Sequence, residues 1–343
     1  MAESSLYQKY RPTRFKDVLG QEHIIKTLAG ALAEGNAGHA YLFVGSRGTG
    51  KTSVARILAK ELGAHDADIH EIDAASYTGV DNIRALREEA ASMPFQSEKK
   101  VYIVDEVHML SKSAFNAFLK LLEEPPSHVA FILATTELEK VPDTIQSRCQ
   151  IFTFKKPTQK VLSEMVLRVA KAEGFTIEKA SSELISLLAD GSFRDGLSIL
   201  QKVLASSADK KVSVEEVAMV TGAPRSELIE RVISGLSKGD AGDPLAAVGE
   251  AVAGNADMGI FAMLLVERLR ILLMLRYAPA FGKELAAELT DTDREALEGF
   301  AKDRESKISS DTLRKFILAS IETSRAPLPQ LPLELAILEL SSQ

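Results

Sequence analysis

The chain has 343 residues, a length typical of about two to three domains, and its 45% hydrophobic content suffices for folded cores. A net charge of −7 argues against a strongly basic nucleic-acid-binding module, although a local basic face is compatible with it. Cys149 is the single cysteine, which excludes an internal disulfide and any cysteine-based zinc site. The N-terminus lacks a signal-peptide pattern, and charges interrupt the most apolar stretch, residues 260–274. We therefore expect a cytoplasmic protein that does not span a membrane.

The N-terminal segment, residues 9–21, mixes aromatic, basic and turn residues ahead of a helix that begins near Gln21. It can be an ordinary arm that packs on the core. A nucleotide site nearby would give it a second use, because a nucleotide needs side chains that hold its base. The candidates for that contact are Tyr10, Arg11, Pro12 and Val18.

A phosphate-binding motif lies between a predicted strand, residues 40–44, and a predicted helix, residues 52–62. It fits the pattern G-x-x-x-x-G-K-[ST], in which glycines let backbone N–H groups converge on phosphates at a helix N-terminus. Lys51 would reach the β- and γ-phosphates, and Thr52 would bind Mg²⁺. The alternative is a plain glycine-rich turn. The predicted phosphate-binding residues are Gly45, Ser46, Gly48, Thr49, Gly50, Lys51, Thr52 and Ser53.

Two acids end a later apolar run, residues 100–106, which follows a predicted strand over 70–75 and a helix over 81–91. Such a run is typical of a strand buried on both faces of a parallel sheet, whose ligands bind at strand C-termini. Asp105 would hold Mg²⁺ through water, and Glu106 would orient and deprotonate the attacking water. The alternative is a solvated acidic strand end.

The next two strands complete the predicted sheet. Ser111 can cap a helix that ends before Pro125, and a fourth buried strand over 129–134 ends in two threonines. Thr136 could hydrogen-bond the attacking water or the γ-phosphate, or it could simply end the strand. A fifth strand, residues 150–154, follows a short helix. Strands that alternate with helices indicate a parallel α/β sheet wound on both faces.

From Pro157 onward the pattern predicts helices only. The expected helices cover residues 159–173, 178–189, 194–206, 214–220, 259–277 and 312–324. A turn-rich stretch, residues 221–224, marks a second boundary. We therefore predict three domains, with bounds 1–156, 157–222 and 223–343.

Several short motifs outside the phosphate loop also resemble those of a known protein family. They cover residues 9–12, 18–21, 105–111, 120–126, 135–136, 147–149 and 191–194. Together with the loop, they resemble the motifs of the AAA+ clamp loaders, and more narrowly those of the gamma/tau subunits of bacterial DNA polymerase III. The C-terminal third matches mainly by position and helical character.

The resemblance implies roles for single residues. Asp105 and Glu106 would be the Walker-B acids, and Thr136 would be sensor 1. Arg194 would be the sensor-2 arginine that reports a γ-phosphate to the lid. Arg148 would be the arginine finger supplied to a neighbouring subunit's nucleotide. The adenine contacts would be Tyr10, Pro12 and Val18.

The resemblance also implies a function. An AAA+ P-loop ATPase domain, a small helical lid and an all-α collar would use ATP and Mg²⁺ to load the sliding clamp onto primer–template DNA during replication. The partners would be the delta and delta-prime subunits, further copies of this chain, the clamp and DNA. The ATPase would act within the DNA-directed DNA polymerase III holoenzyme, a nucleotidyltransferase, without a polymerase active site of its own.

The chain departs from the family pattern in two ways. The four-cysteine zinc module is absent, and residues 63–70 simply cross the gap; His65, Asp66, Asp68 and His70 could ligate a metal, but we expect a solvated loop and no zinc. The printed sequence also ends after the helical segment, so we expect a gamma-like form without the tau extension.

Two other functions are compatible with parts of the pattern. A non-hydrolysing structural subunit like delta-prime would keep residues 147–149 and the collar, but it would not need the intact Lys51, Thr52, Asp105 and Glu106. The second alternative is another AAA+ DNA motor, such as a branch-migration helicase or an archaeal-type clamp-loader small subunit. A winged-helix end would favour the helicase, and the long-helix pattern does not.

Overall fold

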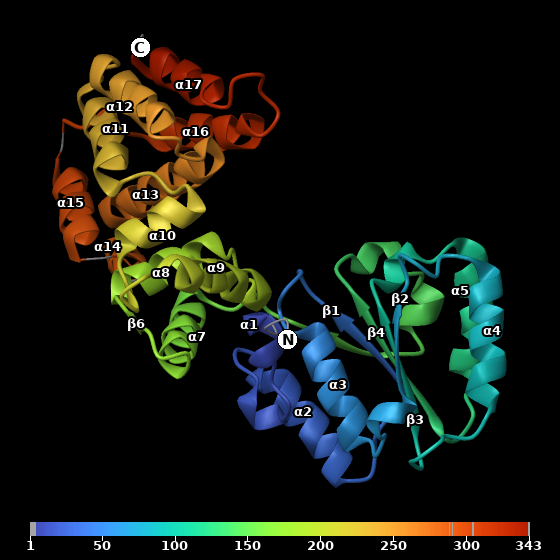
Figure 1. Cartoon of the computed structure of the whole chain (residues 1–343). Helices are drawn as coiled ribbons and strands as arrows, with labels where there is room; N and C mark the ends of the chain where they lie inside the picture. The colour runs from blue at the N-terminus through green and yellow to red at the C-terminus, as the bar shows by residue number, and fades with distance from the viewer. Residues whose placement is uncertain (1–4, 288, 290, 304, 342–343) are drawn as a thin grey trace. The chain divides into compact units, whose positions relative to one another are not determined.

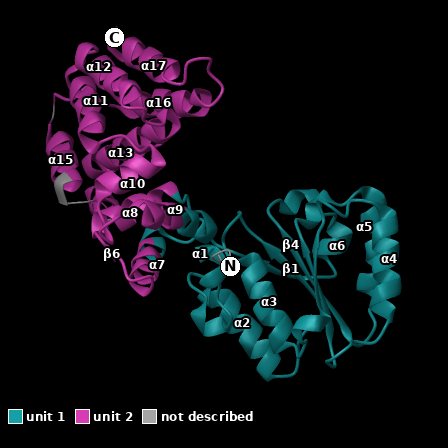
Figure 2. Ribbon diagram, viewed as in Figure 1, with its two compact units in different colours: residues 1–162, 189–198 teal, residues 163–188, 199–343 magenta. Residues whose placement is uncertain are grey.

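The computed structural model describes residues 5–287, 289, 291–303 and 305–341. The chain divides into two compact units (Figure 2). Unit 1 holds residues 1–162 and 189–198, and unit 2 holds residues 163–188 and 199–343. The predicted boundary near residue 222 falls within unit 2, and the division into three domains stays a prediction.

Unit 1 is built on a five-stranded parallel sheet with the strand order β2-β3-β4-β1-β5 (Figure 1). Its strands are β1 (Ala40–Val44), β2 (Ile69–Asp73), β3 (Lys100–Asp105), β4 (Val129–Thr135) and β5 (Gln150–Thr153). β1 lies between β4 and β5, and β3 pairs with β4, so the polar ends of β1, β3 and β4 share one edge. The predicted α/β fold is confirmed, and the predicted strand ends agree with the observed ones to within two residues.

Helices cover both faces of this sheet because the strand side chains alternate between two apolar cores. Tyr41 and Phe43 face one core, and Leu42 and Val44 face the other. The first core is covered by α2 (Glu22–Ala33) and α3 (Lys51–Glu61). The second is covered by α4 (Val80–Ala91), α5 (Lys112–Glu123) and α6 (Asp143–Gln146). Short elements connect them: α1 (Leu6–Lys9), η1 (Phe15–Asp17), η2 (Asp66–Asp68), η3 (Val107–Met109) and η4 (Leu138–Lys140).

The start of α5 agrees with the sequence pattern. The Ser111 hydroxyl accepts a hydrogen bond from the Ala114 backbone N–H at 3.2 Å, so Ser111 is the N-cap as predicted. The helix buries Phe115, Phe118 and Leu122 on one face, which places its other face toward solvent. This cap fixes the chain direction just after η3, close to the acids that end β3.

Unit 2 is almost entirely helical. Its helices are most of α7 (Gln159–Ala172) and α9 (Phe193–Ser206), together with α8 (Lys179–Leu188), α10 (Val214–Thr221), α11 (Ser226–Lys238), α12 (Gly242–Ala253), α13 (Met258–Tyr277), α14 (Pro279–Ala286), α15 (Asp291–Lys302), α16 (Ser310–Thr323) and α17 (Leu331–Ser341). α13 is apolar on most sides and packs against α11, α14, α15 and α16. Across the described residues, no helix combines the length and apolar character needed to cross a bilayer.

One expectation for this region was wrong. β6 (Thr176–Ile177) and β7 (Lys211–Val212) form a small parallel sheet, where the sequence pattern predicted helices only. Strands of two residues show no alternation over 4–8 residues, which is the signal that identifies a strand in a sequence.

Candidate nucleotide-binding site

The phosphate loop leaves β1 and enters α3 with its lysine turned inward. Only 6% of Lys51 is exposed, and its Nζ donates hydrogen bonds to the Gly45 carbonyl at 2.7 Å and the Ser46 carbonyl at 3.0 Å. Burial lowers the pKa of Lys51, and the nearby Glu106 and Asp105 carboxylates oppose that shift. Two carboxylates therefore favour a charged ammonium group at the base of the loop.

Two loop glycines have no room for a side chain. A Cβ on Gly45 would lie 2.7 Å from the Phe154 carbonyl oxygen, and a Cβ on Gly48 would overlap the Ser192 side chain. Both residues also have positive φ, 156° and 76°, so glycine suits them on backbone grounds as well. The sequence pattern thus reflects close packing of the loop as well as phosphate binding.

Thr52 and Asp105 meet at the edge of the sheet. The Thr52 hydroxyl donates to Asp105 Oδ2 at 3.0 Å, although the two residues are far apart in the sequence. A hydroxyl and a carboxylate at this distance form the hard oxygen pair that suits Mg²⁺. The predicted pair is therefore brought together, and its chemistry fits the ion.

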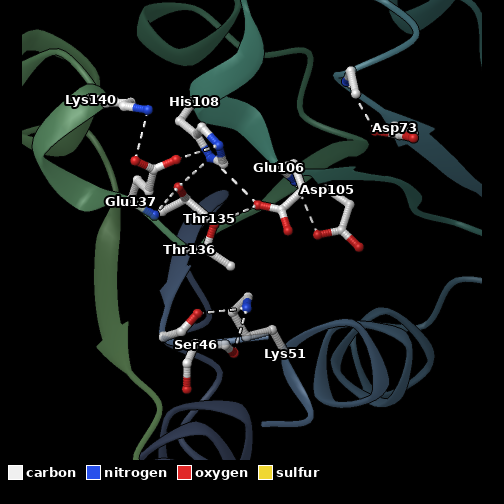
Figure 3. A network of polar contacts seen from close by, with 12 residues as sticks. Ser46, Lys51, Asp73, Asp105, Glu106, His108, Thr135, Thr136, Glu137 and Lys140 are labelled. Carbon is white, nitrogen blue, oxygen red and sulfur yellow. Dashed lines mark hydrogen bonds and ion pairs between the residues drawn. The ribbon is translucent and has the colours of Figure 1, made fainter. Parts of the chain in front are cut away.

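Glu106 follows β3 in the left-handed backbone region, with φ 49° and ψ 44°. Its backbone N–H donates to Asp105 Oδ1 at 3.0 Å, and its Oε2 accepts from the Thr136 hydroxyl at 3.1 Å (Figure 3). The structure thus brings the predicted base and the predicted sensor threonine into direct contact. Their catalytic roles stay predictions.

The sequence analysis missed a polar group beside Glu106. His108, from η3, is buried and lies within hydrogen-bond or ion-pair distance of Thr135, Glu106 and Glu137, and Glu137 also pairs with Lys140 (Figure 3). The signal available in the sequence was a histidine three residues after Asp105. Its partners on the β4 side only become neighbours because β3 pairs with β4.

A second missed residue is Gln21, which is fully buried at the start of α2. Its side-chain amide donates to the Lys155 carbonyl at 2.7 Å and accepts from the Lys155 N–H at 3.2 Å. Gln21 thereby fixes the N-terminal segment to the chain that leaves β5. Tyr10, Pro12 and Val18 are partly exposed in this segment. Their contact with adenine stays a prediction.

The predicted sensor arginine lies against an aromatic ring. The Arg194 guanidinium is 4.9 Å from the centre of the Tyr7 ring, within the range of a cation–π contact. The start of its helix touches the phosphate loop, since the Phe193 N–H donates to the Gly48 carbonyl at 3.0 Å. Arg194 is thus within unit 1 and tied to the loop through its helix, and its sensing role stays a prediction.

Arg148 lies near the N-terminal ends of the sheet strands, whereas the phosphate loop follows the C-terminal end of β1. Gln150 pairs with Tyr41 at the start of β1, whereas Gly45 follows the end of β1. Strands of this length span roughly 15 Å, at about 3.3 Å per residue. Arg148 Nη2 forms an ion pair with Glu123 at 2.5 Å, and Nη1 donates to the Thr144 carbonyl at 2.7 Å. The strand register therefore places Arg148 away from its own chain's phosphate loop.

The residues weighed as metal ligands have other partners. The Asp68 carboxylate accepts from the backbone N–H groups of Phe95 and Gln96 and from the Ser97 hydroxyl. His70 pairs with Glu89 and stacks on Tyr102. Within the described residues, no cluster of three or more His, Cys, Asp or Glu side chains could hold a metal ion. The expectation of no zinc stays a prediction.

Comparison with known proteins identifies relatives over most of the chain. The family models that match are "DNA polymerase III, delta subunit" over residues 64–158 and "Magnesium chelatase, subunit ChlI" over residues 14–109. The chain is 40% identical to DNA polymerase III subunit tau of Bacillus subtilis over 87% of its own length and 57% of the relative's. It is 37% identical to subunit tau of Escherichia coli over 84% of its own length and 48% of the relative's.

Solved structures match the fold. The RuvB Holliday junction branch migration motor of Thermotoga maritima superposes with a TM-score of 0.53 at 23% identity, covering 66% of this chain and 79% of that one. An identity this low supports the fold alone. The chain spans about half the length of the curated relatives it matches. Over that span, the chain is a homologue of the DNA polymerase III gamma/tau subunits, the family that its motifs resemble.

Proposed function

We propose that this chain is the ATP-hydrolysing motor subunit of the bacterial DNA polymerase III clamp loader. The observation that carries the proposal is that three features lie together at the C-terminal ends of the strands. They are the buried Lys51, the hydrogen bond between Thr52 and Asp105, and the hydrogen bond between Glu106 and Thr136. The chain that carries them is a homologue of gamma/tau. In the assembly, ATP would favour opening of the sliding clamp and binding of primer–template DNA. Hydrolysis would release both and leave the clamp on DNA.

The residues divide the reaction between them. Backbone N–H groups of the loop and Lys51 would bind the phosphates, and Thr52 and Asp105 would hold Mg²⁺, which supplies positive charge that neutralises the phosphates. Glu106 accepts a proton as water attacks the γ-phosphorus, and the bond from that phosphorus to the β–γ bridging oxygen breaks, giving ADP and phosphate. Thr136 holds the Glu106 carboxylate through its hydroxyl, at 3.1 Å.

In this proposal, Arg148 acts as an arginine finger at the nucleotide site of a neighbouring subunit. Its distance from its own phosphate loop supports action in trans, because a guanidinium at the other sheet edge can only reach phosphates of another chain. Glu123 holds Arg148 in the isolated chain. Formation of a subunit interface would replace or reorient that ion pair.

An apolar surface on unit 2 supports the collar role. α16 and α17 pack together and leave large aliphatic side chains exposed on both helices. Leu318, Ile321 and Leu335 are at least half exposed, which is unusual for side chains of this size. The exposed aliphatic residues are Ile317, Leu318, Ile321, Leu328, Leu331, Leu335 and Leu338. Further copies of the chain or the delta and delta-prime subunits would cover this surface.

A direct experiment tests the proposal. ATP hydrolysis by the purified chain is measured alone and then with delta, delta-prime, clamp and primed DNA. We expect weak hydrolysis by the chain alone and strong stimulation by the full mixture, because the finger comes from a neighbour. A chain that assembles but never hydrolyses ATP would instead be a delta-prime-like structural subunit, and stimulation by branched DNA without a clamp would favour another AAA+ motor.

A further inference from the structure

A line of polar contacts runs from η4 through His108 to Glu106 (Figure 3). The His108 side chain is 6% exposed. Its Nε2 lies 3.2 Å from Glu137 Oε1, and its Nδ1 lies 2.9 Å from Thr135 Oγ1 and 3.4 Å from Glu106 Oε2. The ring therefore lies between two carboxylates: Glu137, which follows β4, and Glu106, which follows β3.

The partners of the ring determine which nitrogen carries the proton. Nε2 makes the shorter of the ring's two carboxylate contacts, 3.2 Å to Glu137 against 3.4 Å from Nδ1 to Glu106, and a carboxylate can only accept, so we place the proton on Nε2. Lys140 lies 2.7 Å from Glu137, and its hydrogen bond lowers the pKa of Glu137 and keeps it ionised. The Thr135 hydroxyl accepts from the Glu137 backbone N–H at 3.0 Å, which leaves its own hydrogen to donate to Nδ1. The ring nitrogen that faces Glu106 is then Nδ1, which carries a lone pair and no proton.

An unprotonated Nδ1 cannot donate to Glu106. At 3.4 Å from Oε2 it is a polar but non-bonding neighbour, so the hydrogen bond from Thr136 is the contact that holds the carboxylate. The ring also lies between the Glu106 carboxylate and the Glu137–Lys140 ion pair (Figure 3). The left-handed backbone of Glu106 fixes where that side chain starts.

We infer that His108 is a positioning residue that keeps the Glu106 carboxylate on the Thr136 side, and that Glu137 holds His108 in place for this purpose. The inference rests on the proposed function, because the base role of Glu106 belongs to it. It adds two residues that lie outside the phosphate loop to the set that determines the rate of hydrolysis.

Kinetics of the assembled chain provide the first test. His108→Ala is expected to lower kcat about 10- to 100-fold, because a small displacement of a catalytic group has an effect of this size. KM and the affinity for ATP should stay at the wild-type values, since neither residue is among those proposed to bind nucleotide. Glu137→Gln lowers kcat less. Glu139→Gln is the matched control: it makes the same charge change on η4 at an exposed side chain, and it leaves kcat unchanged.

A double mutant shows whether His108 acts through Glu106. In the Glu106→Gln background, His108→Ala should cause no further loss of single-turnover hydrolysis, because the group that it positions is already gone. A further loss as large as that in the wild-type background would overturn the inference. If Glu106→Gln alone hydrolyses ATP normally, the base assignment in the proposed function fails instead.

A spectroscopic readout on the nucleotide-free chain is independent of activity and of whether His108→Ala folds. With ¹⁵N-labelled histidine, the imidazole nitrogen shifts should identify His108 as the Nε2–H tautomer, and Glu137→Gln should disturb that signal while Glu139→Gln does not. A Nδ1–H tautomer in the wild-type chain, or a signal insensitive to Glu137→Gln, would contradict the inference.

Discussion

Replacement of Arg148 separates a finger that acts in trans from a structural ion pair. The ion pair with Glu123 is partly solvated, with 35% of the Arg148 side chain and 47% of the Glu123 side chain exposed. Exposed pairs of this kind contribute about 0–1 kcal/mol to folding, and the hydrogen bond to the Thr144 carbonyl adds about another 1 kcal/mol. A catalytic finger, by contrast, contributes about 10³–10⁵ in rate. Arg148→Ala should therefore destabilise the chain by no more than about 2 kcal/mol, leave ATP affinity nearly intact and abolish DNA- and clamp-stimulated hydrolysis.

Glu123→Gln is the matched control, because it breaks the same ion pair but keeps the guanidinium. If Arg148 were only structural, both variants would show the same small effect in thermal unfolding and hydrolysis. Mixing supplies the second assay: Arg148→Ala chains keep an intact phosphate loop, and Lys51→Ala chains keep an intact finger. Partial recovery of hydrolysis in mixed assemblies supports a shared site, and no recovery despite demonstrated co-assembly would refute the reasoning.

Three further predictions concern unit 1. Lys51→Ala should abolish ATP binding, measured by fluorescent-nucleotide titration; it should also destabilise the chain by about 1–3 kcal/mol, because two loop carbonyls lose their buried donor. Metal analysis after mild dialysis should find no zinc, and chelators should leave the unfolding temperature unchanged; about one zinc per chain would overturn this. Burial alone would raise the pKa of Asp68, but hydrogen bonds from residues 95–97 outweigh it and lower the pKa to about 2. A depressed folded-state pKa adds stability that is present above the ordinary value near 4 and lost as pH falls toward 2, so Asp68→Asn should destabilise the chain at pH 7 and have a shrinking effect near pH 3.

The fold of unit 1 could be predicted because its three central strands, β1, β3 and β4, are buried on both faces and read as continuous apolar runs. The phosphate loop could be predicted because its geometry depends on residues adjacent in the sequence. The burial of Lys51 could not be predicted, because its side chain lies among carbonyls of its own loop, a contact that no spacing rule indicates.

The contacts that the sequence analysis missed join segments far apart in the chain. His108 meets Glu137 because β3 and β4 are neighbours, and Ser192 lies against Gly48 because the start of α9 packs on the phosphate loop. Tertiary packing decides both contacts, and the sequence could nominate the residue types but not their partners. The nearness of Thr136 and Glu106 could be anticipated, because the strand order of parallel nucleotide-binding sheets places those two strand ends together, but the hydrogen bond between them was not predicted.

The most direct test of the central claim follows a labelled sliding clamp onto primed circular DNA, loaded by assemblies that contain either the wild-type chain or Glu106→Gln. With ATP, the wild-type assembly should transfer the clamp to DNA and dissociate. The Glu106→Gln assembly should bind ATP, clamp and DNA but stay bound, because the amide preserves shape and cannot take a proton from water. Release and repeated loading by Glu106→Gln at the wild-type rate would contradict the account.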